Sequence, residues 1–401
     1  MTRIPPNATL RVTDFVPSFS DDELARLHRQ LVAARDNVPR ETYASRQPQY
    51  GTQHAWLKDS LEYWHDSFDW RKYEQSINSV QHYKADIEQG GSTFTIEFIA
   101  HFSTDPNAIP LMLCHGWPGS ALEFVHVVKI LSESTSPAFH VIAANQPGYL
   151  WSSPPPLDRK FGLDDCAEIL HKLMIGLGFT RGYAVQGGDI GSVLARMMAC
   201  KYKECLAVNF NYLPLLPPPA VEGSDEDPAT RGLTELEIKN ARKALEFART
   251  GRAYASLQGT RPATAGLIMQ SSPLALLAWL GEKFHEWTDE SPTLDDLLGT
   301  VTAWYILETY PTSIWPYAEI PTGVGTIHRD PTLYVHKPMG FSSFACEISS
   351  APRAWAAQTG NLQFYKYHER GGHFAASERP QEFAQDMVNC FSQIWPGFLD
   401  E

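Results

Sequence analysis

Long hydrophobic runs are absent from this chain of 401 residues. The longest strongly apolar stretch covers only residues 274–280, whereas a helix that spans a bilayer needs about 20 apolar residues. The N-terminal sequence MTRIPPNATL also lacks the apolar segment of a secretory signal peptide. We therefore expect no membrane anchor and no cleaved leader.

Cysteine and basic charge are also scarce. The six cysteines form no CxxC pair, and several fall in expected strands or helices. This favours buried, reduced thiols and a cytoplasmic protein. The net charge of −13 disfavours nucleic acid or anionic lipid as a partner. Neither an HExxH zinc motif nor a phosphate-binding loop occurs, so we expect no metal and no cofactor.

The N-terminal part of the chain is predicted to be helical. Ser20 and Glu23 form a capping box for a helix over residues 21–36. Residues 55–80 are rich in aromatic side chains, which indicates an amphipathic segment that packs on a larger body.

Short apolar runs alternate with helical patterns from about residue 81. The expected strands lie at 109–115, 138–144, 182–187 and 206–212, and one of the helices between them covers 163–177. Near-continuous apolar strands separated by helices are typical of a parallel sheet that is covered on both faces. The fold class is therefore α/β, with a mostly parallel sheet.

A segment rich in proline and acidic residues, 214–230, interrupts this alternation and is predicted to be a linker. A helix follows from a capping box at Thr234 and Glu237, and strands return only at 332–336 and 362–368, before a terminal helix. We expect the following segments: an N-terminal helical or meander region at 1–80, an α/β core at 81–213 and 326–401, and a helical cap at 214–325.

The sequence GGDIG at 187–191 lies between an expected strand and an expected helix. Its small-x-nucleophile-x-small pattern is typical of a nucleophile elbow, a sharp turn that lifts the central side chain above the sheet edge. The central residue is Asp189, and the helix N-terminus beside it favours an anion. The alternative is a glycine-rich turn in which Asp189 only caps the helix.

The motif HGWPGS at 115–120 follows an earlier strand. A loop of this kind supplies one backbone N–H to an oxyanion hole, and the residue after the nucleophile supplies another. The predicted donors are Trp117 and Ile190, whereas His115 is interpreted as structural. A simple Pro-Gly turn is the alternative, but it does not predict a partner elbow downstream.

A histidine in a glycine loop after the last strand, His373, is where the elbow fold places its general base. His368 falls within the strand pattern and is interpreted as structural. The acid partner should follow an earlier strand, and Glu347 fits this position best. Asp330 is a rival, but it precedes the strand expected at 332–336 and so falls at the wrong end.

The motifs HGWPGS, VQGGDIGS and RGGHFA, together with the aromatic N-terminal region, resemble the microsomal-type epoxide hydrolase family, especially its soluble fungal members. The resemblance covers nearly the whole chain, and the motifs agree in order and spacing. It implies an α/β-hydrolase core, a helical cap and an N-terminal meander. By analogy it also implies a homodimer and a cis peptide between Trp117 and Pro118.

The resemblance further implies two cap tyrosines that grip an epoxide oxygen. Tyr254, in TGRAYASLQGTRP, matches the first, and Tyr317, in PTSIWPYAE, matches the second. Tyr305 and Tyr310 are lesser candidates for the second role. The family's acid is Asp or Glu, so Glu347 fits the pattern.

The implied reaction is hydrolysis of a small-molecule epoxide to a vicinal diol. Asp189 would attack an epoxide carbon and form an ester, and His373, oriented by Glu347, would then activate water. Two alternatives stay open. The first is a haloalkane dehalogenase, which often carries a tryptophan directly after the same nucleophile, where this chain has Ile190. The second is a non-hydrolytic ligand-binding protein of the same fold, which would lack at least one of the catalytic residues.

Overall fold

The computed structural model describes residues 4–215, 217, 230–320 and 323–400. Within these residues one sheet of nine strands runs in the order β1-β2-β3-β5-β4-β6-β7-β8-β9. The strands are β1 Val12–Phe15, β2 His82–Gln89, β3 Ser92–His101, β4 Ile109–Cys114, β5 Phe139–Ala144, β6 Tyr183–Gly187, β7 Cys205–Phe210, β8 Val335–Phe344 and β9 Gly360–His368. The strands from β5 to β9 in this order pair in parallel, which confirms the expected α/β class, and β1, β2 and β3 pair antiparallel.

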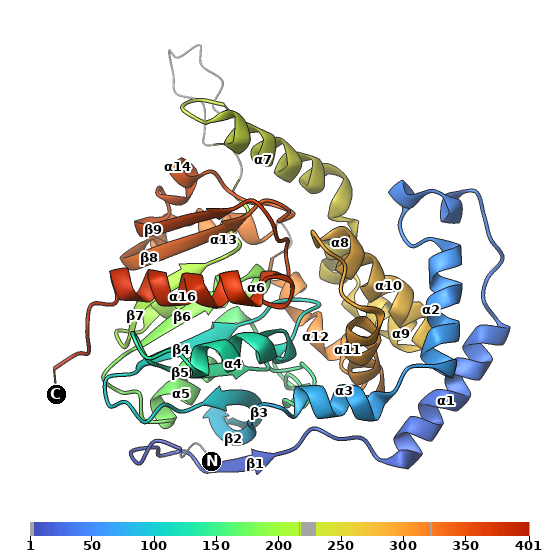
Figure 1. The fold of residues 1–401 in the computed structure, drawn as a ribbon, viewed down its shortest axis with the longest axis horizontal. Helices are drawn as coiled ribbons and strands as arrows, with labels where there is room; N and C mark the ends of the chain where they lie inside the picture. The colour runs from blue at the N-terminus through green and yellow to red at the C-terminus, as the bar shows by residue number, and fades with distance from the viewer. Residues whose placement is uncertain (1–3, 216, 218–229, 321–322, 401) are drawn as a thin grey trace.

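Helices cover both faces of the parallel part of the sheet (Figure 1). On β4, Leu111 and Leu113 belong to the core cluster that includes helices α4 and α16, whereas Met112 and Cys114 belong to the cluster that includes α5 and α6. Alternate side chains of a strand point to opposite faces. The uninterrupted apolar run of β4 therefore follows from burial on both sides.

The helices agree closely with the sequence pattern. Both predicted capping boxes, Ser20 with Glu23 and Thr234 with Glu237, are present. The longer helices are α1 Asp21–Asp36, α2 His54–Asp66, α3 Trp70–Ile77, α4 Val125–Ser132, α5 Leu163–Gly176, α6 Asp189–Lys201, α7 Glu235–Glu246, α8 Ala253–Thr260, α9 Pro262–Gln270, α10 Pro273–Glu286, α11 Leu294–Ile306 and α16 Pro380–Ile394. The short ones are α12 Tyr310–Ser313, α13 Val324–His328, α14 Arg353–Ala356 and α15 Ala375–Glu378.

The strand predicted at 332–336 was misplaced. Residues 331–333 form a 3-10 turn, and β8 starts at Val335 and continues through Pro338 and Gly340. Proline and glycine normally argue against a strand, but register shifts next to both residues accommodate them here. Of the predicted linker at 214–230, residues 216 and 218–229 lie outside the described residues.

Between β7 and β8 the chain forms the helices α7 to α13, and Figure 1 shows α8 to α12 gathered beside the sheet. Helix α13 crosses the boundary expected at residue 325, so the division into segments stays a prediction. Among the described residues, no single helix is long and apolar enough to cross a membrane. The pair α9 and α10 meets the length and composition criteria only when taken together, across a bend of 114°.

The N-terminal region contacts both the sheet and the cap. Strand β1 extends the sheet by pairing with β2, while α1 and α2 lie against the far side of the cap helices (Figure 1). The Trp64 indole N–H donates to Thr302 Oγ1 over 3.0 Å, and the Tyr63 hydroxyl donates to Asp295 over 2.9 Å. The aromatic residues of this region therefore pack on a larger body, as expected.

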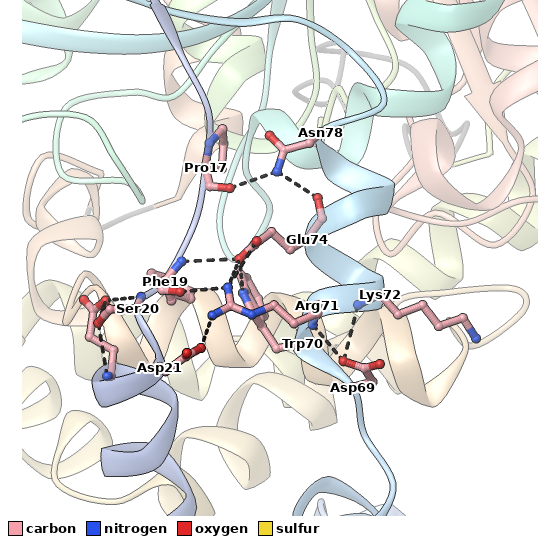
Figure 2. A network of polar contacts seen from close by, with 11 residues as sticks. Pro17, Phe19, Ser20, Asp21, Asp69, Trp70, Arg71, Lys72, Glu74 and Asn78 are labelled. Carbon is pink, nitrogen blue, oxygen red and sulfur yellow. Dashed lines mark hydrogen bonds and ion pairs between the residues drawn. The ribbon is translucent and has the colours of Figure 1, made fainter.

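A network of polar contacts fastens the segment before α1 to α3 (Figure 2). Glu74 accepts from the Trp70 indole N–H over 2.6 Å and from the backbone N–H of Phe19 over 3.3 Å. Arg71 donates to Glu74 over 2.9 Å and to Asp21 over 2.5 Å. One carboxylate, that of Glu74, thus joins two segments that are far apart in the sequence.

Candidate active site

Asp189 lies at the turn between β6 and α6, directly after Gly188. Its φ of 47° is in the left-handed region, which costs a non-glycine residue about 1–3 kcal/mol. The turn is tight, because a Cβ at Gly191 would lie 2.1 Å from the carbonyl oxygen of Cys114. This is the geometry of a nucleophile elbow, with a carboxylate at the positive end of a helix.

The loop after β4 supplies a hydrogen-bond donor to this carboxylate. The N–H of Trp117 donates to Asp189 Oδ1 over 2.9 Å, and a Cβ at Gly116 would lie 2.3 Å from the same oxygen. The Trp117–Pro118 peptide is cis, as the resemblance implies. Ile190 makes no hydrogen bond to Asp189 in the described structure, although the N–H of a helix's second residue has no intrahelical acceptor.

His115 is buried at the start of this loop. The backbone N–H of Gln146 donates to its Nε2 over 3.1 Å, so Nδ1 carries the proton and donates to the Gly116 carbonyl over 3.0 Å. Burial lowers the pKa of His115 to about 4. His115 is thus a neutral imidazole with a hydrogen bond at each nitrogen, which agrees with the structural role expected for it.

His373 and Glu347 complete the group around Asp189. His373 Nδ1 bonds Glu347 Oε1 at 2.7 Å, and its Nε2 lies 3.4 Å from Asp189 Oδ2. The backbone N–H of Ile348 donates to Glu347 Oε1 over 2.7 Å, and the backbone N–H of His373 donates to the Trp287 carbonyl over 2.8 Å. The structure therefore brings nucleophile, base and acid candidates into one line of contacts.

Two carboxylates decide the charge of His373. Burial lowers the pKa of His373, but Glu347 and Asp189 together outweigh burial and raise it above the usual 6.5. His373 is therefore protonated at neutral pH. Any change that removes the charge of Asp189 takes away one of these two partners and lowers the pKa of His373.

Tyr254 on α8 and Tyr317 on a 3-10 turn, Trp315–Ala318, approach Asp189 from the cap. Their ring centroids lie 5.8 Å apart, and both line a cavity of about 210 Å³ with Asp189. Burial raises the pKa of both hydroxyls, and the charge of Asp189 raises it further. Both phenols therefore stay protonated and can donate hydrogen bonds at neutral pH.

The two lesser tyrosine candidates are placed differently. The Tyr310 hydroxyl donates to Gln258 Oε1 over 3.0 Å, so this donor already has a partner. Tyr305 is not among the residues that line the cavity with Asp189. The structure therefore favours Tyr254 and Tyr317 over this second pair.

Asp330, the rival for the acid, and His368, the second histidine, bond to residues other than Asp189 and His373. Asp330 accepts from the backbone N–H of Thr332 over 2.9 Å and caps the 3-10 turn before β8. His368 Nε2 bonds Asp386 Oδ2 on α16 at 2.7 Å. Both side chains thus serve local structure.

Sequence reasoning missed Glu123, three residues beyond the HGWPGS motif. Glu123 lines a cavity of about 20 Å³ with Asp189, His373 and Asn211, which is enough room for about one water molecule. Burial raises the pKa of Glu123 to about 8, although the charge of His373 opposes this. In the sequence, Glu123 is simply a carboxylate just after the HGWPGS loop. A glutamate on the protein surface could occupy the same place, so the sequence does not single it out.

Tyr212 was also missed. It lies two residues beyond β7, and its ring packs edge-on to His373 with centroids 5.1 Å apart. Among the described residues, no group of three or more His, Cys, Asp or Glu side chains is placed to hold a metal ion.

Comparisons with known proteins agree with this geometry. Residues 12–124 match the family described as epoxide hydrolase N terminus, and residues 109–293 match the alpha/beta hydrolase fold family. A putative epoxide hydrolase of Dothistroma septosporum is 36% identical over 397 residues, which cover 96% of this chain and 91% of the relative. Epoxide hydrolase 1 of Oryctolagus cuniculus is 31% identical and covers 94% of this chain and 88% of its own.

Solved structures extend the similarity to the whole fold. The Aspergillus niger epoxide hydrolase superimposes with a TM-score of 0.90 at 37% identity, over 98% of this chain and 99% of that one. The juvenile hormone epoxide hydrolase of Bombyx mori gives a TM-score of 0.82 at 25% identity, over 96% of this chain and 95% of that one. The aligned residues include the N-terminal region, the sheet and the cap, and we conclude that this chain is a member of the epoxide hydrolase family with an α/β-hydrolase fold.

Proposed function

We propose that the protein hydrolyses epoxides to vicinal diols through a covalent ester on Asp189. The observation that carries this proposal is a carboxylate at the nucleophile elbow, with the phenols of Tyr254 and Tyr317 across the same cavity. A carboxylate displaces at a saturated carbon and forms an ester, and a phenol donates a proton to a leaving oxygen. The names of the similar proteins point to the same substrate class.

In the first step Asp189 Oδ2 attacks an epoxide carbon, because Oδ1 is already held by the N–H of Trp117. The new C–O bond forms as the ring C–O bond breaks, and the ring oxygen takes a proton from Tyr254 or Tyr317. The product of this step is an uncharged ester on Asp189 and a tyrosinate. The charged His373 then returns a proton to the tyrosine, which leaves both groups neutral.

In the second step neutral His373 acts as the base. Its pKa has fallen because the ester no longer carries the charge of Asp189. A water molecule in the small cavity beside Glu123 gives a proton to His373 and attacks the ester carbonyl carbon. The N–H groups of Trp117 and Ile190 would hold the resulting oxyanion, and one such donor is worth about 3 kcal/mol. As the oxyanion collapses, the bond between the carbonyl carbon and the diol oxygen breaks, and this oxygen takes the proton of the new carboxyl group. The diol leaves, and Asp189 is again a carboxylate beside a protonated His373.

Glu347 keeps His373 in this orientation and stabilises the imidazolium that forms. Because water attacks the carbonyl carbon of Asp189, its oxygen first enters the carboxylate of the enzyme. The diol of a first turnover therefore carries an oxygen that came from Asp189. Direct attack of water on the epoxide would place the water oxygen in the diol at once.

This difference gives the decisive test. Purified protein in excess is mixed with aryl and alkyl epoxides in ¹⁸O water, and the diol is examined by mass spectrometry after one turnover. We expect unlabelled diol in the first turnover, labelled diol under multiple turnover, and ¹⁸O in the peptide that contains Asp189. Labelled diol in the first turnover would exclude the ester, and Asp189→Ala should give only background diol.

Haloalkane dehalogenation is the second candidate function for a protein with an aspartate at the nucleophile elbow. Ile190 supplies no side-chain donor for a halide, and the matched relatives are named epoxide hydrolases. A parallel assay for halide release from chloroalkanes and bromoalkanes separates the two reactions.

The homodimer and the cytoplasmic location also remain proposals. The homodimer rests on analogy with the family, and sedimentation velocity of the purified protein tests it. The reducing compartment is supported by six free cysteines.

A further inference from the structure

A buried chain of hydrogen bonds runs from Arg196 to the backbone of Asp189. Arg196 Nε–H donates to His328 Nδ1 over 2.7 Å, and His328 Nε2 lies 2.9 Å from Ser192 Oγ. The Ser192 hydroxyl donates to the carbonyl oxygen of Asp189 over 2.5 Å. Ser192 and Arg196 belong to α6, as Asp189 does, whereas His328 ends α13.

The guanidinium sets the direction of the whole chain. Arginine has only donors, so His328 Nδ1 must accept and the imidazole proton must sit on Nε2. His328 Nε2–H then donates to Ser192, which leaves the serine hydroxyl proton free to donate to Asp189. Each group thus has one arrangement that satisfies its neighbours.

These bonds are shielded from solvent, because Ser192 and Arg196 are 0% exposed and His328 is 1% exposed. Burial and the charge of Arg196 lower the pKa of His328 well below its usual value, which agrees with a neutral ring. Among the described residues no carboxylate lies within ion-pair distance of Arg196. The other donors of the guanidinium bond the carbonyls of Leu333 and Thr359 and the Thr359 hydroxyl, which hold the group in place. Its charge therefore polarises the chain toward Asp189.

The chain connects two parts of the candidate site. Asp189 holds a left-handed φ that its surroundings must maintain, and its carbonyl is where the chain ends. Val324 and Gly325, on the same short helix as His328, line the cavity that contains Asp189. His328 and Ser192 therefore link α13 to the strained turn.

We infer that His328 is a positioning residue, which holds the strained turn of Asp189 in its attacking conformation through Ser192 and is itself oriented by Arg196. This inference rests on the proposed role of Asp189 as nucleophile. His328 does not touch the substrate and exchanges no proton with it. Its effect is on the rate at which Asp189 forms the ester.

Single-turnover stopped-flow fluorescence tests the inference, because Trp117 and Trp287 lie beside Asp189 and His373. His328→Phe removes both bonds and should slow ester formation by about 10- to 100-fold, as expected for a misplaced reacting group. His328→Gln should recover the rate to within about threefold, because a carboxamide offers one acceptor and one donor as neutral imidazole does. Ser192→Ala removes only the last bond and should slow the same step.

His82 provides a matched control. It is equally buried, at 1% exposure, and bonds Glu97 at 2.7 Å, but it is absent from the cavities around Asp189. His82→Phe should lower the melting temperature without slowing ester formation. Wild-type rates in both His328→Phe and Ser192→Ala would overturn the inference, as would a His328→Gln variant as slow as His328→Phe.

Nuclear magnetic resonance gives a readout that does not depend on turnover. The ¹⁵N shifts of His328 should report a protonated Nε2 and an unprotonated Nδ1, and the opposite tautomer would overturn the inference. Failure of the proposed function is distinguishable, because the wild-type protein would then form no ester with any epoxide while the tautomer remained as stated.

Discussion

His373 lies between two carboxylates that have different fates in the proposed reaction. Glu347 takes no part in the covalent bond, whereas Asp189 loses its charge when the ester forms. The same histidine is thus a cation in the resting enzyme and a base in the intermediate. Its raised pKa also adds to the stability of the folded protein below about pH 6.5, the value in an unfolded chain, and that contribution is lost as the pH rises through the folded value.

The effect of the Asp189 charge on the pKa of His373 can be measured directly. In Asp189→Ala the pKa of His373 should fall relative to wild type, because one of the two carboxylates that raise it is gone. Titration of the His373 ring proton by nuclear magnetic resonance gives the value, with Tyr305→Phe as the control that should not change it. An unaltered pKa in Asp189→Ala would show that the two side chains do not interact electrostatically.

The tyrosine pair permits a second test at this scale. Tyr254→Phe and Tyr317→Phe should each lower the rate constant of ester formation by about 10- to 100-fold. The double variant should lower the same rate constant by about 10²- to 10⁴-fold. Ester hydrolysis should change little, because the phenols act on the first step. Tyr305→Phe, which alters a tyrosine outside the cavity, should retain the wild-type rate; equal losses in all three single variants would exclude a specific role.

Among the secondary-structure elements, α3 connects the N-terminal region to the rest of the molecule. Glu74 on this helix accepts hydrogen bonds from three residues, Arg71, Trp70 and Phe19 (Figure 2). Removing a shared acceptor leaves buried donors unpaired, which costs more than one ordinary hydrogen bond. Tyr73, also on α3, packs its ring directly against Gly299 of the cap. A Cβ at Gly299 would lie only 2.3 Å from that ring.

We expect Glu74→Ala to lower the free energy of unfolding by about 1–3 kcal/mol. Urea denaturation followed by tryptophan fluorescence measures this change. Glu62→Ala is the matched control, because Glu62 forms an exposed pair with Lys58 at 3.9 Å and should contribute less than about 0.5 kcal/mol. Equal effects in the two variants would mean that the network in Figure 2 adds no stability.

At the scale of the whole molecule, the cavity beside Asp189 lies where the cap meets the ends of the strands. The cavity of about 210 Å³ takes its walls from α6, from the loop after β7 and from the cap, including Phe247 and Tyr254. We expect a cavity of this volume to favour small epoxides. The size limit is therefore a property of the way cap and sheet pack together.

Phe247→Ala should move this limit. Removing the ring enlarges the cavity, so kcat/KM for a bulky aryl epoxide should rise about tenfold relative to a small alkyl epoxide. Leu245→Ala, at a residue that is exposed and does not line the cavity, should leave the ratio unchanged. An unchanged ratio in Phe247→Ala would place the size limit elsewhere.

Local patterns were enough to predict the elements and the order of the motifs. The capping boxes, the buried strands before Asp189 and Trp117, and the glycine loop of His373 are short-range features, because each depends on neighbours within one or two turns. The strand at 332–336 was misplaced, since the bulges that let β8 continue past Pro338 and Gly340 depend on its partners in the sheet.

By itself, the sequence determined the α/β class, the nucleophile elbow and the choice of an aspartate in it, because these follow from periodicity and from the steric needs of a tight turn. The tertiary structure decided which residues meet there. Glu123 and the chain through His328 come from segments whose sequence carries no local signal. Their roles depend on burial and on contacts across more than a hundred residues, and only the folded chain creates those conditions.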